Sequence, residues 1–226
     1  MDRDAFFAQI AGRLGRPRIE RAPPRDEVGV PEFHLRDESA PDLLTQFETE
    51  LTGIGGRVRR ARDIAHASEV LRAELDEWKP ASIVTWGRSE FEGWNLAWLW
   101  EERGALAYGD RQLGGETELR RAMFAADMGI TTVEFAVAAT GSLAVSAAPT
   151  RPRGISLVPT MHVALVRRSQ IVRRMGIALA EYGQRSRMPS GIHFISGPSR
   201  TSDIENDLTI GVHGPAALVA IVVEAA

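Results

Sequence analysis

Two short polar segments contain the residue types that could together bind a small anion. The first is Thr140-Gly141-Ser142, which lies between two apolar runs. The second follows the apolar run 192–195 and includes Gly197, Ser199, Arg200 and Thr201. Glycine lets backbone N–H groups approach an anion, hydroxyls can donate to it, and a guanidinium can hold a carboxylate or phosphate through two hydrogen bonds. The competing interpretations are a glycine-containing hairpin for the first segment and a turn with a helix cap for the second.

Histidines and acidic residues offer acid–base or metal chemistry. His213 stands before Gly214-Pro215, where it could act as a general base, bind a substrate carboxylate, or be a buried histidine bonded to the backbone. His162 begins another apolar run and has the same alternatives. The five histidines lack zinc-binding spacing, and the acidic segment 203–207 lacks the glycine and the closing glutamate of a calcium loop. We therefore predict no metal site.

The composition is that of an ordinary globular protein and argues against several function classes. The 226 residues suffice for one sizeable domain, and the net charge of −3 gives no basic field for nucleic acid. There is no cysteine, so these residues form no disulfide, no thiolate nucleophile and no cysteine-ligated iron–sulfur cluster. No apolar run reaches membrane-spanning length and the charged N-terminus is unlike a signal peptide, so a cytoplasmic location is expected.

Helical and strand patterns alternate along most of the chain, which predicts an α/β fold with an open sheet flanked by helices. Residues 4–14 have helical apolar spacing and precede a stretch rich in proline and arginine. Residues 1–38 are therefore interpreted as an N-terminal helix and linker arm, and 39–226 as the α/β domain. The runs 192–195 and 208–212 are expected to be buried strands, whose carboxyl ends would bring both polar segments to the ligand-binding edge of the sheet.

Element boundaries follow from capping and periodicity. Ser39 and Ser68 are the expected N-caps of two helices, the second of which ends at Trp78. The remaining helices are expected at 92–103, 116–128 (ending at Gly129) and 170–182. The three tryptophans of 92–103 are interpreted as a packed helix face rather than a platform for stacking bases. The remaining strands are expected at 57–62, 82–86, 105–108, 131–138, 143–146, 155–158, 162–166 and 217–223.

Four motifs make the chain resemble the lactate utilization protein C family, whose domain is called the LUD domain. They are AATGSLAVS at 138–146, SLVPTMHVALV at 156–166, GPSRTSDIE at 197–205 and GVHGP at 211–215. The resemblance implies a NagB/RpiA/CoA-transferase-like fold. It also implies an accessory role beside an iron–sulfur subunit and a second subunit in oxidising L-lactate to pyruvate. The cluster would lie on the partner, with no cofactor on this chain.

One position departs from the family pattern. Members often carry a glutamate directly before the Thr-Gly pair, where this chain has Ala139. If that glutamate is catalytic in other members, this chain either lacks its function or uses Glu134 from the same apolar run. The alternative to the lactate role, by analogy of fold alone, is an enzyme or binding protein for an anionic small molecule such as a phosphorylated sugar, an acyl-CoA or a folate.

Overall fold

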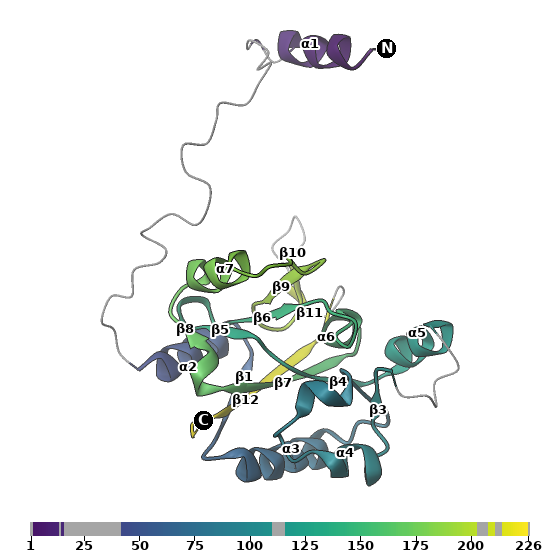
Figure 1. Cartoon of the computed structure of the whole chain (residues 1–226), viewed down its shortest axis with the longest axis vertical. Helices are drawn as coiled ribbons and strands as arrows, with labels where there is room; N and C mark the ends of the chain where they lie inside the picture. Colours follow the sequence, from purple (N-terminus) through teal and green to yellow (C-terminus); the bar gives the residue numbers. More distant parts are fainter. Residues whose placement is uncertain are drawn as a thin grey trace.

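The architecture is that of a computed structural model (Figure 1), which describes residues 2–13, 15, 42–109, 116–202, 208–210 and 214–225. Within these ranges only the backbone is described at residues 3, 116, 119, 200–202 and 208–210. His213 and the side chains of Arg200 and Thr201 therefore lie outside the description. The predicted boundary between residues 38 and 39 also falls outside it and stays a prediction.

A six-stranded parallel sheet forms the centre of the molecule. Its strands lie in the order β1-β12-β7-β4-β2-β3, and every neighbouring pair runs parallel. Strands β4, β7 and β12 are apolar runs that are almost entirely buried, as expected where a parallel sheet is covered on both faces. The strand bounds are β1 Arg57–Ala61, β2 Ile83–Thr85, β3 Leu106–Ala107, β4 Met128–Thr132, β7 Met161–Arg167 and β12 Ala217–Val223.

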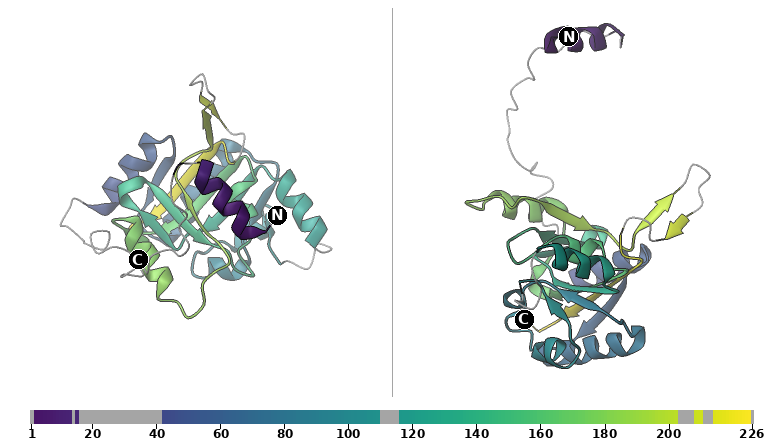
Figure 2. Two further views of the ribbon diagram at one scale, coloured as in Figure 1. Left: turned by 90° about the horizontal axis from the view of Figure 1, so that it is seen from above. Right: turned by 90° about the vertical axis from the view of Figure 1, so that its right-hand side faces the viewer.

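A second sheet has four strands in the order β8-β5-β6-β9. Strand β6 runs antiparallel to β5 and β9, and β8 runs parallel to β5. The bounds are β5 Phe135–Val137, β6 Ser142–Ser146, β8 Ile171–Val172 and β9 Ile192–Ile195. A separate antiparallel pair, β10 (Arg200–Ser202) and β11 (Leu208–Ile210), projects from the body (Figure 2). The runs 192–195 and 208–212 were expected in the main sheet, and that prediction is wrong, because their pairing partners are β6 and β10.

The helices and the second sheet enclose the central sheet in layers (Figure 1). Helices α3 (Ile64–Trp78) and α4 (Ala97–Glu101) lie on one side of it, and the second sheet lies on the other side with α7 (Met175–Gly183) beyond. Helix α2 (Leu43–Gly53) contacts β1 and β8, and α6 (Gly154–Leu157) contacts β4 and β7. The remaining helices are α1 (Arg3–Arg13) and α5 (Glu116–Ala125). The predicted open α/β sheet flanked by helices is confirmed.

Aspartates, not the predicted serines, cap helices α2 and α3. Asp63 Oδ1 accepts a hydrogen bond from His66 N at 2.8 Å and begins α3. Ser68 lies inside that helix, where its Oγ accepts from Trp98 Nε1 at 2.7 Å. Asp42 caps α2 in the same way, and Ser39 lies outside the described residues. A serine followed by apolar helical spacing is thus compatible with an interior position as well as with a cap.

Three predicted elements differ from those observed, and the first of them is the strand predicted at 131–138, which divides between β4 and β5. Helix α5 ends at Ala125 and β4 begins at Met128, so Gly129 is a strand residue and not a helix terminator. A Cβ at Gly129 would lie 1.9 Å from the carbonyl oxygen of Ile155, so α6 can approach β4 only because this residue has no side chain. The apolar run 155–158 is part of α6 rather than a strand, since so short a run fits either structure.

Two predicted helices are shorter than expected. In 92–103 only Ala97–Glu101 is α-helical, because Gly93 and Asn95 have φ values of +76° and +52°. In 170–182 the helix begins at Met175, because Ile171 pairs with Ala136 in the second sheet. The interpretation of the tryptophans as packing residues is confirmed for Trp94 and Trp98, which are buried.

Each of the five tryptophans lies beneath an arginine guanidinium. The distances from guanidinium carbon to ring centroid run from 3.7 Å for Arg72 over Trp98 to 5.8 Å for Arg151 over Trp86. The other three pairs are Arg57 with Trp78, Arg167 with Trp94 and Arg88 with Trp100. Such pairs stabilise by roughly 0.5–1 kcal/mol at exposed sites.

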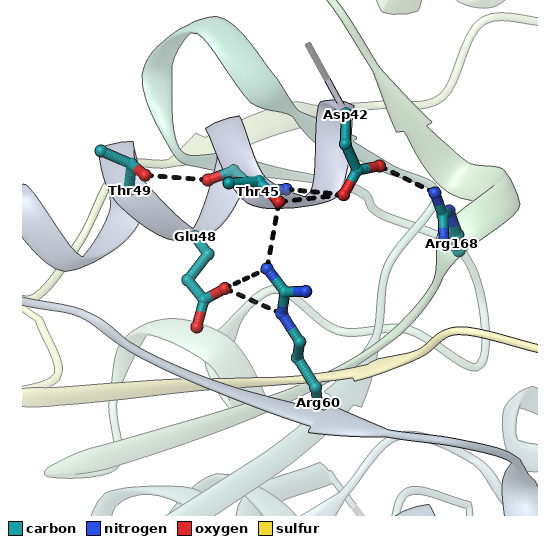
Figure 3. A network of polar contacts seen from close by, with 6 residues as sticks. All are labelled: Asp42, Thr45, Glu48, Thr49, Arg60 and Arg168. Carbon is teal, nitrogen blue, oxygen red and sulfur yellow. Dashed lines mark hydrogen bonds and ion pairs between the residues drawn. The ribbon is translucent and has the colours of Figure 1, made fainter.

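Helix α2 is held against its neighbours by polar contacts (Figure 3) and by apolar contacts. Asp42 accepts a hydrogen bond from Arg168 Nη2, just after β7, at 2.7 Å, and Arg60 Nε on β1 donates to Glu48 at 2.8 Å. These pairs are exposed and contribute about 0–1 kcal/mol each. The larger contribution comes from the fully buried face of the helix, made of Leu44, Phe47 and Leu51.

Within the described residues, no helix is long and apolar enough to cross a membrane.

Candidate functional site

Glu134 lies at the carboxyl edge of the central sheet, which is the edge where open α/β folds bind ligands. Strand β4 ends at Thr132, two residues before Glu134. The neighbouring strand β2 is soon followed by Gly87, whose N–H donates to the carbonyl oxygen of Thr150 at 2.9 Å. This bond brings the turn that follows β6 onto the same edge as Glu134.

Three side chains from separate segments hold the Glu134 carboxylate. Tyr182 Oη on α7 donates to Oε2 at 2.7 Å, and Arg185 Nη1, just after α7, donates to Oε1 at 2.8 Å. Arg151 Nη1, from the turn after β6, lies 3.1 Å from the same Oε1. The Glu134 side chain is only 14% exposed, so these ion pairs are partly shielded from water. Glu134 therefore joins the second sheet, the β6 turn and α7.

The pKa of Glu134 lies below its usual value of 4.5. Burial alone would raise the pKa, but the nearby hydroxyl of Ser146, the hydrogen bonds from Tyr182 and Arg185 and the positive charge of Arg151 outweigh it. The carboxylate is thus ionised at neutral pH. A general base works best with a pKa near the operating pH, so in this state Glu134 is better suited to orient cations than to accept a proton.

Glu134 lies away from Ala139, the position at which the resemblance implies a glutamate before the Thr-Gly pair. Ala139 is exposed and its N–H donates to the carbonyl oxygen of Arg173 at 3.0 Å. Strand β5 spans Phe135–Val137, so Glu134 precedes it and Ala139 follows it. The two positions lie at opposite ends of one strand, and a catalytic role for Glu134 stays a prediction.

The Thr140-Gly141-Ser142 turn packs against the C-terminal half of α2. Gly141 has a φ of +59°, and a Cβ there would lie 2.3 Å from the backbone nitrogen of Leu51. Ser142 is fully buried, and its Oγ lies 2.7 Å from both Thr140 Oγ1 and Ser196 Oγ. Close packing thus accounts for the glycine. Of the two hydroxyls, that of Thr140 belongs to an exposed residue.

The structure brings the segment around Gly197 next to this turn. The Ser142–Ser196 contact joins the two, and a Cβ at Gly197, whose φ is +82°, would lie 2.9 Å from the carbonyl oxygen of Ile54. Ser199 N donates to the carbonyl oxygen of Pro215 at 2.8 Å. The predicted ligand-binding residues Thr140, Gly141, Ser142, Gly197 and Ser199 therefore gather between α2 and the start of β12.

These predicted ligand-binding residues lie at the amino edge of the central sheet and not at the predicted carboxyl edge. Pro215 precedes β12, and Ala216 N donates to the carbonyl oxygen of Thr160, which precedes β7. The expected placement is wrong because β9 belongs to the second sheet. Glu134 and the glycine turns consequently do not form one site. Ligand binding by the turns, with Arg200 and Thr201, stays a prediction.

His162 is a buried core histidine. Its Nε2 lies 2.9 Å from Thr131 Oγ1, and burial lowers its pKa to about 3, so the ring is neutral. Among the described residues, no group of three or more His, Cys, Asp or Glu side chains is arranged to hold a metal ion. The candidate base His213 lies outside the described residues.

Sequence reasoning missed the partners of Glu134. Arg151 lies in the turn after β6, Arg185 in the loop after α7, and Tyr182 on α7 itself. Tyr182 gave the one available signal, because a buried tyrosine usually needs a partner for its hydroxyl. Nothing in the local spacing relates residues 134, 151 and 185, which meet only through the tertiary fold.

The fold is of the open-sheet α/β class, with a second sheet packed on one face of the parallel sheet. A charged cluster around Glu134 lies at the carboxyl edge of that parallel sheet. The sequence profile of the LUD domain matches residues 44–223, and the chain belongs to the LUD domain family.

Similar proteins agree with this assignment. Lactate utilization protein C of Halalkalibacterium halodurans is 29% identical over 228 residues, covering 98% of this chain and 97% of that protein. The protein of the same name from an Exiguobacterium species is 30% identical over 225 residues, covering 95% and 92%. The crystal structure of a DUF162 family protein from Deinococcus radiodurans superposes with a TM-score of 0.58 at 21% identity, covering 83% of this chain and 99% of that one. That likeness shows a shared fold.

Proposed function

We propose that this chain is an accessory component of a system that oxidises L-lactate to pyruvate, acting beside an iron–sulfur subunit and a second subunit. The observation that carries the proposal is the match to lactate utilization protein C relatives over nearly the whole length of both chains. A match of that extent includes every element of the fold and not one shared motif.

The absence of cysteine supports the proposal that the electron-carrying group lies on a partner. Oxidising lactate removes two electrons and two protons, so an acceptor must be within reach of the substrate. Iron–sulfur clusters are held by cysteine thiolates, and the 226 residues contain none. A cluster does not fit these residues, so this chain would bind, orient or connect components.

The predicted anion site around Gly197 gives this role a chemical basis. In this proposal backbone N–H groups, the Thr140 hydroxyl and Arg200 hold an anionic small molecule. Arg200→Ala should weaken the binding of such an anion by roughly 1.5–3 kcal/mol, the usual range for hydrogen bonds to a charged group. Arg200→Lys should recover part of the loss, because lysine keeps the positive charge but cannot donate two parallel hydrogen bonds as a guanidinium does. Calorimetry with lactate, pyruvate, phosphate and acyl-CoA measures this, and equal binding of every anion by wild type and Arg200→Ala would exclude the site.

A second candidate function is an enzyme that acts on an anionic small molecule, such as a phosphorylated sugar, an acyl-CoA or a folate. The observation that favours it is the position of Glu134 at the carboxyl edge, among arginines. In this alternative Glu134 and His213 are the candidate catalytic residues.

The test is an affinity purification of the tagged protein from lactate-grown cells, with co-purifying proteins and small molecules identified by mass spectrometry. The proposal expects a cysteine-rich iron–sulfur protein to co-purify and the isolated chain to be colourless and free of iron. Recovery of the chain alone with a bound phosphorylated sugar, acyl-CoA or folate would favour the second candidate.

A further inference from the structure

A surface pocket of about 580 Å³ lies beside Glu134, between the turn after β6 and the loop after α7. Its charged lining consists of Arg151, Arg185 and Arg187, and no acidic side chain from the described ranges lines it. The volume falls within the range of small-molecule sites. Three guanidinium groups around one cavity form an anion-binding surface unless nearby carboxylates already neutralise them.

The carboxylates behind the pocket neutralise only part of this charge. Glu134 Oε1 contacts both Arg151 and Arg185, at 3.1 Å and 2.8 Å. Glu90 lies 3.6 Å from Arg151 Nε and also accepts a hydrogen bond from Thr150. Arg187 forms no ion pair with any described residue. Three positive and two negative charges leave one positive charge at the pocket.

Hydrogen-bonding capacity also remains unused at the same place. Each guanidinium has five N–H donors, and Glu134 occupies one of them on Arg151 and one on Arg185. Arg151 Nε is buried and makes no hydrogen bond within the described residues, since Glu90 is beyond hydrogen-bonding distance. Ser146 is 2% exposed and lines the pocket, and its Oγ makes no hydrogen bond of standard geometry, although it lies near enough to Glu134 to stabilise the charge.

We propose that the pocket lined by Arg151, Arg185 and Arg187 binds the carboxylate of a small organic acid. Glu134 fixes the guanidinium groups of Arg151 and Arg185 in place, while Arg187, which also lines the pocket, binds the ligand. A monocarboxylate matches the single uncompensated charge, whereas a phosphate dianion would exceed it. The site lies at the carboxyl edge of the central sheet, whereas the glycine turns lie at the amino edge. It goes beyond the lactate role, because it would stand even if that role failed its test.

Calorimetric titrations of the full chain at low ionic strength, with the sodium salts of L-lactate, pyruvate, acetate and phosphate, test the proposal. Arg187→Ala should raise the Kd of the carboxylate that binds by about tenfold or more, since hydrogen bonds to charged groups are lost. Arg187→Lys should show an intermediate Kd. Arg121→Ala, on α5 and equally exposed, is the control and should bind as wild type.

Glu134→Gln should change the carboxylate affinity in the direction opposite to Arg187→Ala. It keeps the side-chain shape but removes the competing carboxylate, so carboxylate affinity should rise by about threefold or more. The circular dichroism spectrum checks that each variant is folded. Binding of none of the carboxylates, an unchanged Kd in Arg187→Ala, or tighter binding of phosphate than of every carboxylate would overturn the proposal.

Discussion

At the scale of single residues, the carboxylate of Glu134 is held by three side chains at once. One carboxylate accepts from a buried tyrosine and an arginine and lies beside a second arginine. Removing a partner from such a cluster leaves a shielded charge uncompensated, which costs more than the pair contributes when intact. We therefore expect Glu134 to affect both stability and ligand binding.

The stabilising effect of Glu134 should depend on pH. Its pKa is lowered in the folded protein, so the unfolded chain takes up a proton first as the pH falls. The wild-type advantage in melting temperature over Glu134→Gln should be full above pH 4.5 and should shrink as the pH falls below it. Thermal denaturation of both proteins from pH 7 to pH 3 measures this. A difference that stays constant or grows toward low pH would show that the charge of Glu134 does not stabilise the fold.

Gly141 should be the less replaceable of two glycines with the same backbone conformation. Gly141 and Gly104 have φ values of +59° and +65°, but only Gly141 has backbone atoms in the space of a Cβ. Gly104→Ala should cost about 1 kcal/mol of unfolding free energy through backbone strain alone. Gly141→Ala should cost roughly a further 1–3 kcal/mol, because α2 must move. Urea denaturation gives both values, and equal losses would contradict the close packing of the turn on α2.

At the scale of elements, the sequence predicts the long apolar strands better than the short elements around them. Strands β7 and β12 match their expected positions because a long apolar run that contains several β-branched residues favours a buried strand. The run 155–158 and the segment 170–182 fail because their structure depends on tertiary partners, namely Gly129 and Ala136. The candidate site follows the same rule: Glu134 was identified as a candidate, but the arginines that surround it come from distant segments.

Asp63 should contribute to stability as the N-cap of α3. Asp63→Ala removes the acceptor for His66 N and should lower the unfolding free energy by about 0.5–2 kcal/mol, whereas Asp63→Asn should retain most of it. Glu69→Ala, an exposed position in the same helix, removes the same charge without a cap and should stay within about 0.5 kcal/mol of wild type. Chemical denaturation compares the three variants. Similar losses in Asp63→Ala and Glu69→Ala would indicate a charge effect instead.

At the scale of the whole molecule, the central sheet separates two chemically different edges. The amino edge carries the glycine turns, which pack on α2, and the carboxyl edge carries Glu134 and its arginines. The residues that match the LUD domain profile, 44–223, include both edges of the sheet. If both proposed sites bind small molecules, a role in lactate oxidation would use two separate surfaces of the chain, one at each edge.

The most direct test of that role is the growth of a strain from which the gene has been deleted, in a background without any other lactate dehydrogenase. The account predicts that the deletion strain fails to grow on L-lactate as carbon source and grows normally on glucose. A plasmid copy of the wild-type gene should restore growth on lactate. Growth of the deletion strain on L-lactate at the wild-type rate would contradict the account.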